Sequence, residues 1–361
     1  MVTIGAAALT DFVRDIFVKA GCSPAEGERI GRYLVTANLT GHDSHGVQRV
    51  PRYLLWKEEG VFVADRDIKI VTETPVLAVV DGQYGFGQTI APQAVALGIK
   101  KCKEMGLSAV ALRNTGHIGR VGDWAEMAAA DGLVSVHFVN AASSVLVAPF
   151  GGVDRRFSTA PYCVGVPRPG KPPLVLDFAT SIVAEGKVLN ASFGGKKIPG
   201  DALIGPDGTK SGNPHLLYGD YTPTGQRDYR KGDGAIRAFG EHKGSGLAFM
   251  CEILGGSLTG TGAAREGRKW SNGMLSFYVD PDKIDSAGFF PEDVASYVDY
   301  VKSARPAEPG GEVLLPGEPE QRMRADRTAN GIPLPDDTWA AIVAAARKVG
   351  VDERRIQQAT A

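Results

Sequence analysis

Apolar residues recur at helical spacing through the first 60 positions of the chain. Four large apolar side chains within 12–17 fall on one face of a helix expected to begin at Thr10 and to end before Gly21. A second helix is expected over 23–41, where Ser and Glu at capping-box spacing flank a proline suited to the first helical position. A third helix is expected over 51–60.

Further along, the pattern changes to short apolar runs that alternate with amphipathic segments. Helices are expected at 90–105 and 123–130. Strands are expected at 76–80, 107–112, 133–139, 162–166, 174–178 and 275–279. Because strands and helices alternate, this part of the chain favours an α/β layer structure.

The composition changes again in the last 170 residues. Residues 196–240 are rich in glycine, proline, aspartate and lysine, which predicts a loop or flap, and 218–235 resembles a surface insertion. The apolar run 247–258 has almost no charge and predicts a helix that is buried on most sides. Further helices are expected at 291–302 and around Arg322 and Ala340.

Bulk composition narrows the class of partner. With 361 residues, of which 43% are apolar and 22% charged, the chain can form a large hydrophobic core. The 40 basic and 41 acidic side chains nearly cancel, so no attraction to nucleic acid or to an anionic membrane is expected. The expected partner is a small molecule or another copy of the chain.

The four cysteines indicate the compartment. They lie far apart in the sequence and form no C-x-x-C pair, which argues against a zinc–thiolate site and against a disulfide framework. The apolar N-terminus lacks the basic flank of a signal peptide, and no run of residues is long and apolar enough for a membrane span. A cytoplasmic location is therefore expected.

The stretch GHDSHG at 41–46 concentrates groups for proton transfer and anion binding, together with Arg49 and Arg52. Histidine suits proton exchange because it titrates near neutral pH. Arginine suits a carboxylate because its planar fork donates two parallel hydrogen bonds. His45 and the two arginines therefore predict the acid/base group and the substrate clamp of an enzyme that oxidises a 2-hydroxy acid, or reduces a 2-oxo acid, with a nicotinamide.

Two other interpretations of this stretch stay open. In the first, His42 and His45 only cap the preceding helix and the arginines are solvated. In the second, His42, Asp43 and His45 bind a metal ion, as in a hydrolase or lyase. No further cluster of histidine, cysteine and carboxylate completes such a coordination shell, so we expect no metal.

Three other stretches can contact a phosphate or a ribose. Residues 115–122, TGHIGRVG, follow a predicted strand, and their glycines allow backbone N–H groups to approach an anion. Their spacing differs from the G-x-G-x-x-G dinucleotide fingerprint, so a glycine-rich turn with a packed histidine is an equal alternative. Residues 177–181, DFATS, and 241–246, EHKGSG, lie at expected element boundaries, where simple helix capping also explains them.

The ordered set of motifs resembles the malate/L-lactate/sulfolactate dehydrogenase family of NAD(P)-dependent oxidoreductases, with the hydroxycarboxylate dehydrogenase branch as the most similar. The resemblance covers essentially the whole chain. Its motifs are GHDSHG at 41–46, NTGHIGR at 114–120, VAPFGG at 147–152, LDFATS at 176–181, EHKGSGLAFMCEILGG at 241–256, LLPGE at 314–318 and NGIPL at 330–334. It implies a mixed-sheet α/β nicotinamide-binding domain that is not of the Rossmann type, which would explain the missing fingerprint.

The resemblance also implies an organisation and a partner. Residues 1–75 would form an N-terminal helical part with the catalytic histidine segment, and 76–305 an α/β domain for cofactor and substrate. Residues 306–361 would form a C-terminal helical part that packs with the N-terminal one. The protein would be a homodimer with each active site near the subunit interface, and it would use NAD or NADP.

Carried onto this sequence, the family assigns roles to individual residues. His45 would donate the proton to the oxo group, with Ser44 and Asp177 in support. Arg49 and Arg52 would bind the substrate carboxylate, and His117 would lie near the substrate or the nicotinamide and join the catalytic set. Cofactor contacts would come from His45, Gly119, Arg120, Val121, Val175, Leu176, Asp177, Phe178, Ala179, His242, Lys243, Gly317 and Glu318.

Two departures from the family leave the substrate open. Ala160 stands where many members have an asparagine in a Gly-Thr-Asn-Pro turn, and 218–235 is longer than the usual connection. A reductase of cyclic imino acids on the same scaffold is the nearest alternative activity. A ligand-binding protein without turnover is a further alternative, which the intact histidine and arginine set disfavours.

Overall fold

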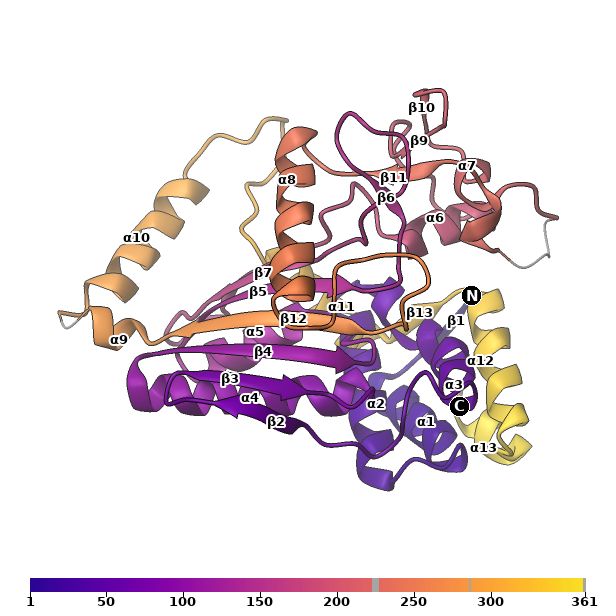
Figure 1. Ribbon diagram of the computed structural model, residues 1–361, viewed down its shortest axis with the longest axis horizontal. Coiled ribbons are helices and arrows are strands. Elements are labelled where there is room, and N and C mark those ends of the chain that lie inside the picture. Colours follow the sequence, from indigo (N-terminus) through magenta and orange to yellow (C-terminus); the bar gives the residue numbers. More distant parts are fainter. Residues whose placement is uncertain (223–226, 286, 360–361) are drawn as a thin grey trace.

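The computed structural model describes residues 1–222, 227–285 and 287–359, and its centre is a seven-stranded mixed sheet (Figure 1). The strand order is β2 (Lys69–Glu73), β3 (Leu77–Asp81), β4 (Leu107–Thr115), β12 (Asn272–Val279), β5 (Val134–Ala141), β7 (Tyr162–Val166) and β8 (Leu174–Phe178). β3 and β4 pair in parallel, whereas the other neighbours pair antiparallel. The expected mixed-sheet α/β architecture is confirmed, and it lacks the all-parallel sheet of a Rossmann fold.

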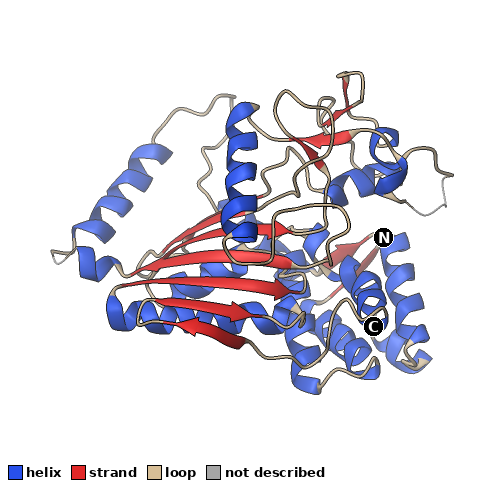
Figure 2. Cartoon of the chain, in the orientation of Figure 1, coloured by secondary structure: helices blue, strands red, loops and turns tan. Residues whose placement is uncertain are grey.

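Helices α4 (Gly87–Met105) and α5 (Gly122–Ala130) cover one face of this sheet (Figure 2). Side chains alternate in burial along β3 and β5, as expected when one face is packed and the other is not. The covered face forms a hydrophobic core with Val95 and Trp124 from the helices and Leu112 and Tyr278 from the strands. The other face leaves Leu107 and Phe277 exposed.

A helical lobe combines the two ends of the chain. It contains α1 (Ala6–Lys19), α2 (Pro24–Leu39), α3 (Val50–Glu58), α11 (Glu318–Asn330), α12 (Asp336–Lys348) and α13 (Glu353–Gln358). Strands β1 (Val2–Ile4) and β13 (Ile332–Leu334) pair antiparallel and join the ends. The Ser23 side chain accepts a hydrogen bond from the Glu26 backbone at 3.2 Å, which confirms the predicted cap of α2.

The first helix begins at Ala6, four residues before the expected Thr10. The sequence pattern rested on the large apolar side chains. The alanines that precede them favour a helix but add little to an apolar periodicity. Among the described residues, no helix has both the length and the apolar character needed to cross a membrane.

The expectation of a loop over 196–240 is only partly confirmed, because short strands and helices interrupt the irregular chain. This segment contributes β9 (Leu203–Ile204), β10 (Lys210–Ser211) and β11 (Ala235–Arg237), which form a four-stranded sheet with β6 (Val147–Ala148). Helices α6 (Glu185–Ser192) and α7 (His215–Tyr218) complete this small lobe, whose residues 223–226 lie outside the described part of the chain. Strands of two or three residues are too short to show a periodicity, so local sequence could not reveal them.

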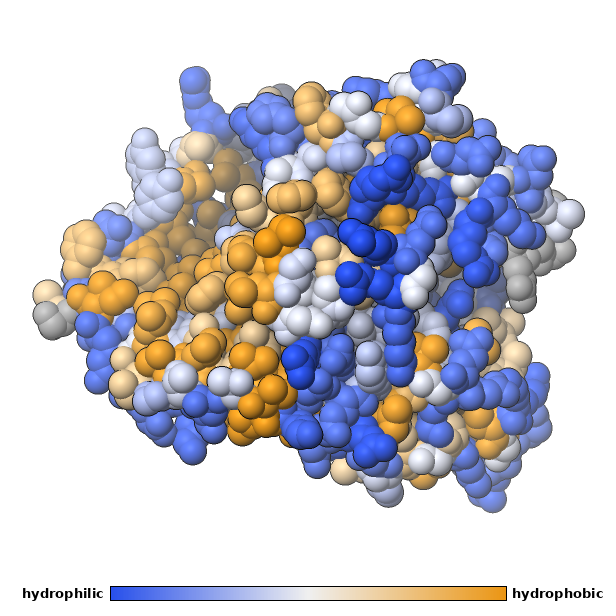
Figure 3. Space-filling view, viewed as in Figure 1, coloured by the Kyte–Doolittle hydropathy of each residue, from blue (hydrophilic) through white to orange (hydrophobic). Residues whose placement is uncertain are grey.

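The expectation that 247–258 is buried on most sides is wrong. The segment covers the second half of α8 (His242–Cys251) and a π-helical turn at Glu252–Ser257. Its large side chains Phe249, Met250 and Leu258 are exposed. An uncharged helix can face either a core or a partner, and sequence alone does not separate the two. Figure 3 shows the apolar side chains that gather on this face of the molecule. Helices α9 (Pro281–Ile284) and α10 (Phe289–Lys302) extend from one end of the sheet.

Candidate active site

The GHDSHG stretch is an ordered connection between α2 and α3. It forms two short 3-10 turns, η1 (Asp43–His45) and η2 (Val47–Arg49). Asn38 holds both turns, because its Nδ2 donates to Asp43 Oδ1 at 2.6 Å and its Oδ1 accepts from the Val47 backbone at 2.8 Å. A Cβ at Gly46 would lie 2.2 Å from Asn38 Oδ1, so only glycine fits between the turns.

The acidic residue of this stretch serves to anchor it. Asp43 accepts hydrogen bonds from both terminal nitrogens of Arg327 on α11, at 2.7 and 3.1 Å. His42 Nε2 lies 3.2 Å from Glu320 Oε1 on the same helix. The C-terminal part of the chain therefore positions the histidine segment. The described residues contain no group of three or more histidines, cysteines and carboxylates arranged to hold a metal ion.

The fold brings His45 and His117 together from positions 72 residues apart. His45 Nδ1 lies 3.2 Å from His117 Nε2, and the two rings are nearly parallel, with centroids 5.1 Å apart. On the far side of His117, the Tyr53 hydroxyl lies 2.5 Å from Nδ1. Tyr53 comes from α3 and is fully buried. A continuous line of hydrogen-bonding groups thus leads from the core to His45.

The surroundings keep both histidines neutral. Burial is the main cause that lowers the pKa of His45 to about 3, and electrostatic interactions with Arg49, His42 and Arg120 lower it further. Burial likewise holds the pKa of His117 well below its usual value, with His45 and Arg49 as further causes. A neutral imidazole has one N–H donor and one acceptor, so each ring can pass on the direction of a hydrogen bond.

The predicted carboxylate clamp lies next to the histidine pair. Arg49 Nε donates to the Ser44 carbonyl oxygen at 2.6 Å, which fixes the guanidinium at the end of η2. Arg52 lies over the ring of Trp56, with 5.8 Å between its Cζ and the ring centroid. The small lobe contacts this region through α6. A Cβ at Gly186 would lie 2.8 Å from Ser44 Cβ. Ser44, His45 and Arg49 therefore lie together in the two adjoining turns.

The glycine-rich turn before α5 combines a left-handed glycine with a buried arginine. The backbone at Gly119 has a φ of +73°, which favours glycine. Arg120 is only 2% exposed, and its guanidinium donates to Asp123 and Glu126 at 2.8 Å each. The Arg120 side chain is therefore held by two carboxylates inside the protein. Gly119 and Val121 are its neighbours in the turn.

The Asp177 carboxylate lies at the start of α5. Its Oδ2 accepts a hydrogen bond from the Gly122 backbone at 2.7 Å, at the first turn of that helix. Its hydrogen bonds among the described residues do not reach His45. Phe178 packs edge-on against Phe239 with ring centroids 5.2 Å apart, Leu176 is 40% exposed, and Ala179 is partly buried.

A cleft of about 520 Å³ is lined by two of the residues expected to contact the cofactor, Val175 and Gly317. Gly317 has a φ of +90°, and a Cβ there would lie 3.2 Å from the Val175 backbone nitrogen. Arg168 and Lys171 also line the cleft, from the turn between β7 and β8. Next to it, Glu318 forms an ion pair with Lys302, with Nζ and Oε1 2.7 Å apart.

The N-terminus of α8 carries His242 and Lys243, both exposed. The backbone approaches closely here, since a Cβ at Gly244 would lie 1.9 Å from the Phe239 carbonyl oxygen. The His242 ring packs against Phe150 with centroids 5.8 Å apart. The described contacts do not join His242 or Lys243 to His45.

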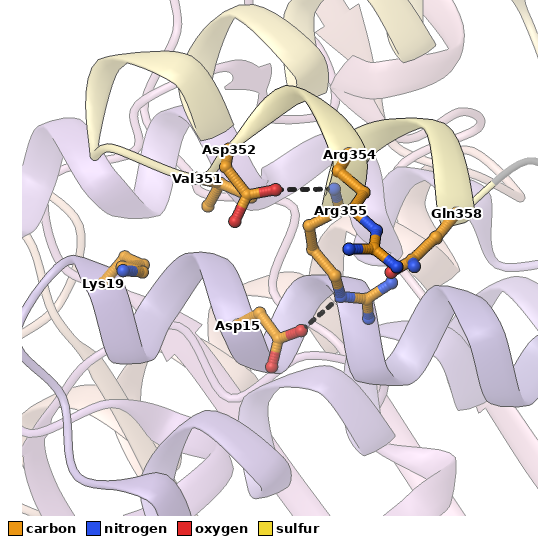
Figure 4. A pocket seen from close by; sticks show the side chains of 7 residues that line it. All are labelled: Asp15, Lys19, Val351, Asp352, Arg354, Arg355 and Gln358. Carbon is orange, nitrogen blue, oxygen red and sulfur yellow. Dashed lines mark hydrogen bonds and ion pairs between the residues drawn. The ribbon is translucent and has the colours of Figure 1, made fainter.

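A second cleft lies in the helical lobe between α1 and α13, with a volume of about 360 Å³. Figure 4 shows Asp15 from α1 paired with Arg355, while Asp352 accepts a hydrogen bond from the Arg355 backbone. Lys19 lines the other end. Because none of its residues belongs to the histidine and arginine set, this cleft is separate from the candidate active site.

Two residues that complete the site were not predicted from the sequence. Tyr53 lies on the helix expected at 51–60, and the sequence assigned it no role in the site. Gln88 lies on α4 and is fully buried, and its Nε2 donates to Tyr53 Oη at 3.1 Å and to the His117 carbonyl oxygen at 3.2 Å. Gln88 precedes the helix expected at 90–105, and a polar residue at that position gives no sign in the sequence that it is buried.

Comparison with known proteins identifies the class. The sequence profile of the malate/L-lactate dehydrogenase family matches residues 4–343. The chain therefore belongs to this family of oxidoreductases, as the motifs predicted.

Particular relatives are similar along the whole length. Hydroxycarboxylate dehydrogenase B of Escherichia coli (strain K12) is 38% identical over 355 residues, which cover 97% of this chain and 95% of the relative. The structure of sulfolactate dehydrogenase from Methanocaldococcus jannaschii matches with a TM-score of 0.84 and 29% identity, covering 99% of each chain. Delta1-piperideine-2-carboxylate reductase from Pseudomonas syringae matches with a TM-score of 0.79 and 28% identity, covering 96% of this chain and 100% of that one.

Proposed function

We propose that this protein interconverts a small 2-hydroxy acid and the corresponding 2-oxo acid with NAD or NADP. The observation that carries the proposal is the placement of His45, stacked on His117, beside the Arg49 guanidinium. Such a reaction needs one group that exchanges a proton with the substrate oxygen and one cation for the carboxylate. The chain has both within one ordered segment, and its relatives include dehydrogenases of hydroxycarboxylates and sulfolactate.

In this proposal the side chains divide the work. His45 donates a proton to the oxo group as the 2-oxo acid is reduced, and His117 orients the His45 ring through Nδ1. Arg49 binds the substrate carboxylate, and Ser44 fixes the Arg49 side chain through its carbonyl oxygen. Asp177 supports the site indirectly, because it holds the start of α5 beside the turn that carries Arg120.

The residues present fit a dinucleotide. The cleft at Val175 and Gly317 has room for part of such a molecule, and the glycine at 317 keeps its wall open. Gly119, Val121, His242 and Lys243 lie at the starts of two helices, where backbone N–H groups favour an anion. When bound, the nicotinamide supplies or accepts the hydride.

Reduction of a cyclic imino acid is the second candidate activity, because one structural relative is named for it. The two reactions differ at the accepting atom, which is oxygen in a 2-oxo acid and nitrogen in an imine. Arg49 would bind the carboxylate of either substrate.

One assay separates these activities. Purified protein is mixed with NADH or NADPH and with a panel of 2-oxo acids and one cyclic imino acid, and cofactor oxidation is followed by absorbance. We expect turnover with at least one 2-oxo acid and insensitivity to chelators. Turnover with the imine alone would assign the second activity, and loss of turnover on chelation would revive the metal-dependent interpretation. Silence of the whole panel would refute both reductase proposals.

We also propose that a second copy of this chain covers the exposed apolar face formed by Phe249, Met250, Ile253 and Leu258. Exposed apolar patches of this kind mark protein interfaces. Because His242 and Lys243 begin the same helix, the interface would adjoin the cofactor site. Replacement Phe249→Glu should shift sedimentation from dimer to monomer, whereas Leu55→Glu on the helical lobe should not. A monomeric wild-type protein would contradict this proposal.

A further inference from the structure

The distances between the hydrogen-bonding groups behind His45 favour one direction of donation. The carbonyl oxygen of His117 accepts but cannot donate, so the group of Gln88 that lies 3.2 Å from it is the amide nitrogen. The same nitrogen lies 3.1 Å from Tyr53 Oη and donates to it. The hydroxyl proton of Tyr53 has two acceptors within reach, His117 Nδ1 at 2.5 Å and the His117 carbonyl oxygen at 3.5 Å, and the much shorter contact assigns it to Nδ1.

The direction continues through both imidazoles. A neutral imidazole that accepts at one nitrogen carries its proton on the other. His117 accepts at Nδ1, so its proton is on Nε2, from which it donates to His45 Nδ1 at 3.2 Å. His45 then carries its own proton on Nε2.

We propose that Gln88 and Tyr53 are positioning residues that set the tautomer of His45. Acting through His117, they keep the proton of neutral His45 on Nε2, the nitrogen left for the substrate. This inference rests on the proposed function only in assigning His45 to the substrate. It gives the resting site the tautomer that donates a proton, which is the form needed to reduce a 2-oxo acid.

Packing makes this arrangement rigid. Tyr53 and Gln88 are both fully buried, and the Tyr53 ring contacts Phe17, Phe62 and Phe86 with centroid distances of 5.7 to 6.4 Å. Burial raises the pKa of Tyr53, so its hydroxyl keeps the proton that it donates. Neither Tyr53 nor Gln88 is exposed, so water does not compete for the hydrogen bonds between them.

The same order opposes protonation of His45. A second proton on that ring would occupy Nδ1 and would meet the N–H of His117, so the whole chain of hydrogen bonds would have to reverse. The charged groups around His45 act in the same sense, because Arg49 of η2, His42 before η1 and Arg120 before α5 all disfavour a further positive charge. Removing the Tyr53 hydroxyl should therefore free both the tautomer and the protonation of His45.

Nuclear magnetic resonance tests this directly in the protein without cofactor or substrate. Long-range ¹H–¹⁵N correlation spectra of histidine-labelled protein report which nitrogen of each imidazole carries the proton. We expect wild-type His45 to be protonated on Nε2. In Tyr53→Phe, we expect a shift toward the Nδ1 tautomer and a higher pKa of His45. The pH profile of kcat/KM should shift with it.

Matched variants separate this role from a loss of stability. Tyr278→Phe removes another fully buried tyrosine hydroxyl, in the sheet core beside His137, and should leave the His45 spectrum unchanged. Gln88→Met removes the donor to Tyr53 at similar volume and should reproduce the effect of Tyr53→Phe in a weaker form. It supplies the answer if Tyr53→Phe does not fold.

Two results would overturn the inference. One is a wild-type His45 that carries its proton on Nδ1. The other is a tautomer and a pH profile that stay the same in Tyr53→Phe and Gln88→Met as in Tyr278→Phe. The expected tautomer together with no turnover on any 2-oxo acid would instead refute the proposed function and leave the positioning role intact.

Discussion

Two histidines, His45 and His137, have a pKa lowered by burial but differ in what surrounds them. His45 lies beside His117, Arg49 and Arg120 at the junction of the helical lobe and the sheet. His137 lies within β5, fully buried, with Ser276 at 2.8 Å from Nδ1 and Ser135 at 3.1 Å from Nε2. Burial lowers the pKa of both His45 and His137 to about 3.

The difference between them shows that a lowered pKa does not identify a functional site. For His137, burial is the single cause of the lowered pKa. Both ring nitrogens lie within hydrogen-bond distance of serine hydroxyls inside the sheet. Among the described residues, the His45 ring forms a hydrogen bond only through Nδ1. It is partly exposed, and two arginines lie close enough to affect its charge. A reactive histidine therefore needs a free nitrogen and a place for an anion, in addition to burial.

The largest effect should come from a matched pair of substitutions at these two histidines. His45→Gln should lower turnover by about 10²- to 10⁴-fold, because it removes the group that donates the proton. His137→Gln should leave turnover close to that of wild type, since both serines keep a partner. Steady-state kinetics measures turnover, and cofactor fluorescence checks that His45→Gln still binds NADH or NADPH. Equal losses of turnover in His45→Gln and His137→Gln would contradict the distinction between the two histidine sites.

The arginine beside His45 should give the next largest effect. Arg49→Lys keeps the charge but loses the planar fork, so the substrate KM should rise about 10- to 100-fold, the equivalent of one charge-assisted hydrogen bond. Cofactor affinity should change little. Arg52→Lys, at a residue that stacks on Trp56, is the matched control and should have a smaller effect on KM. An unaltered KM in Arg49→Lys would place the carboxylate elsewhere.

A smaller effect, shared by both sites, should appear in acid stability. A histidine whose folded pKa is about 3 and whose unfolded pKa is near 6.5 binds a proton only after unfolding in this range. The free energy of unfolding should therefore fall as pH drops from 6.5 toward 3, by up to about 1.4 kcal/mol per pH unit for each such group. His137→Gln should flatten this slope without loss of activity. Denaturant titrations at several pH values measure it, and an unchanged slope would contradict the burial argument.

Much of the fold followed from local pattern. The helices over 24–39 and 50–58 and the strands at 162–166 and 174–178 were predicted because their apolar periodicity and capping residues are strong. The small sheet around β9 and β11 was missed because its strands have two or three residues and depend on pairing with the distant β6. Exposure of α8 was missed because the sequence shows apolar character but not what covers it.

The candidate site was predictable where its residues are neighbours in sequence. His45 and Arg49 share one segment, whereas the contact of His45 with His117 depends on how α3, η1 and the turn before α5 pack. Asp177 was expected in support of His45, and the structure places its described hydrogen bond at α5 instead. Tyr53 and Gln88 were missed. A buried tyrosine in an apolar stripe usually belongs to the core, whereas Tyr53 belongs both to the core and to the site.

The most direct test of the account follows the hydrogen atom itself. Purified protein is incubated with a 2-oxo acid and NADH or NADPH deuterated at the transferable position, and the hydroxy acid product is examined by mass spectrometry. The account predicts a product with deuterium on C2, formed at a much lower rate by His45→Gln and at an undiminished rate by His137→Gln. A product without deuterium, or the same rate in both variants, would contradict it.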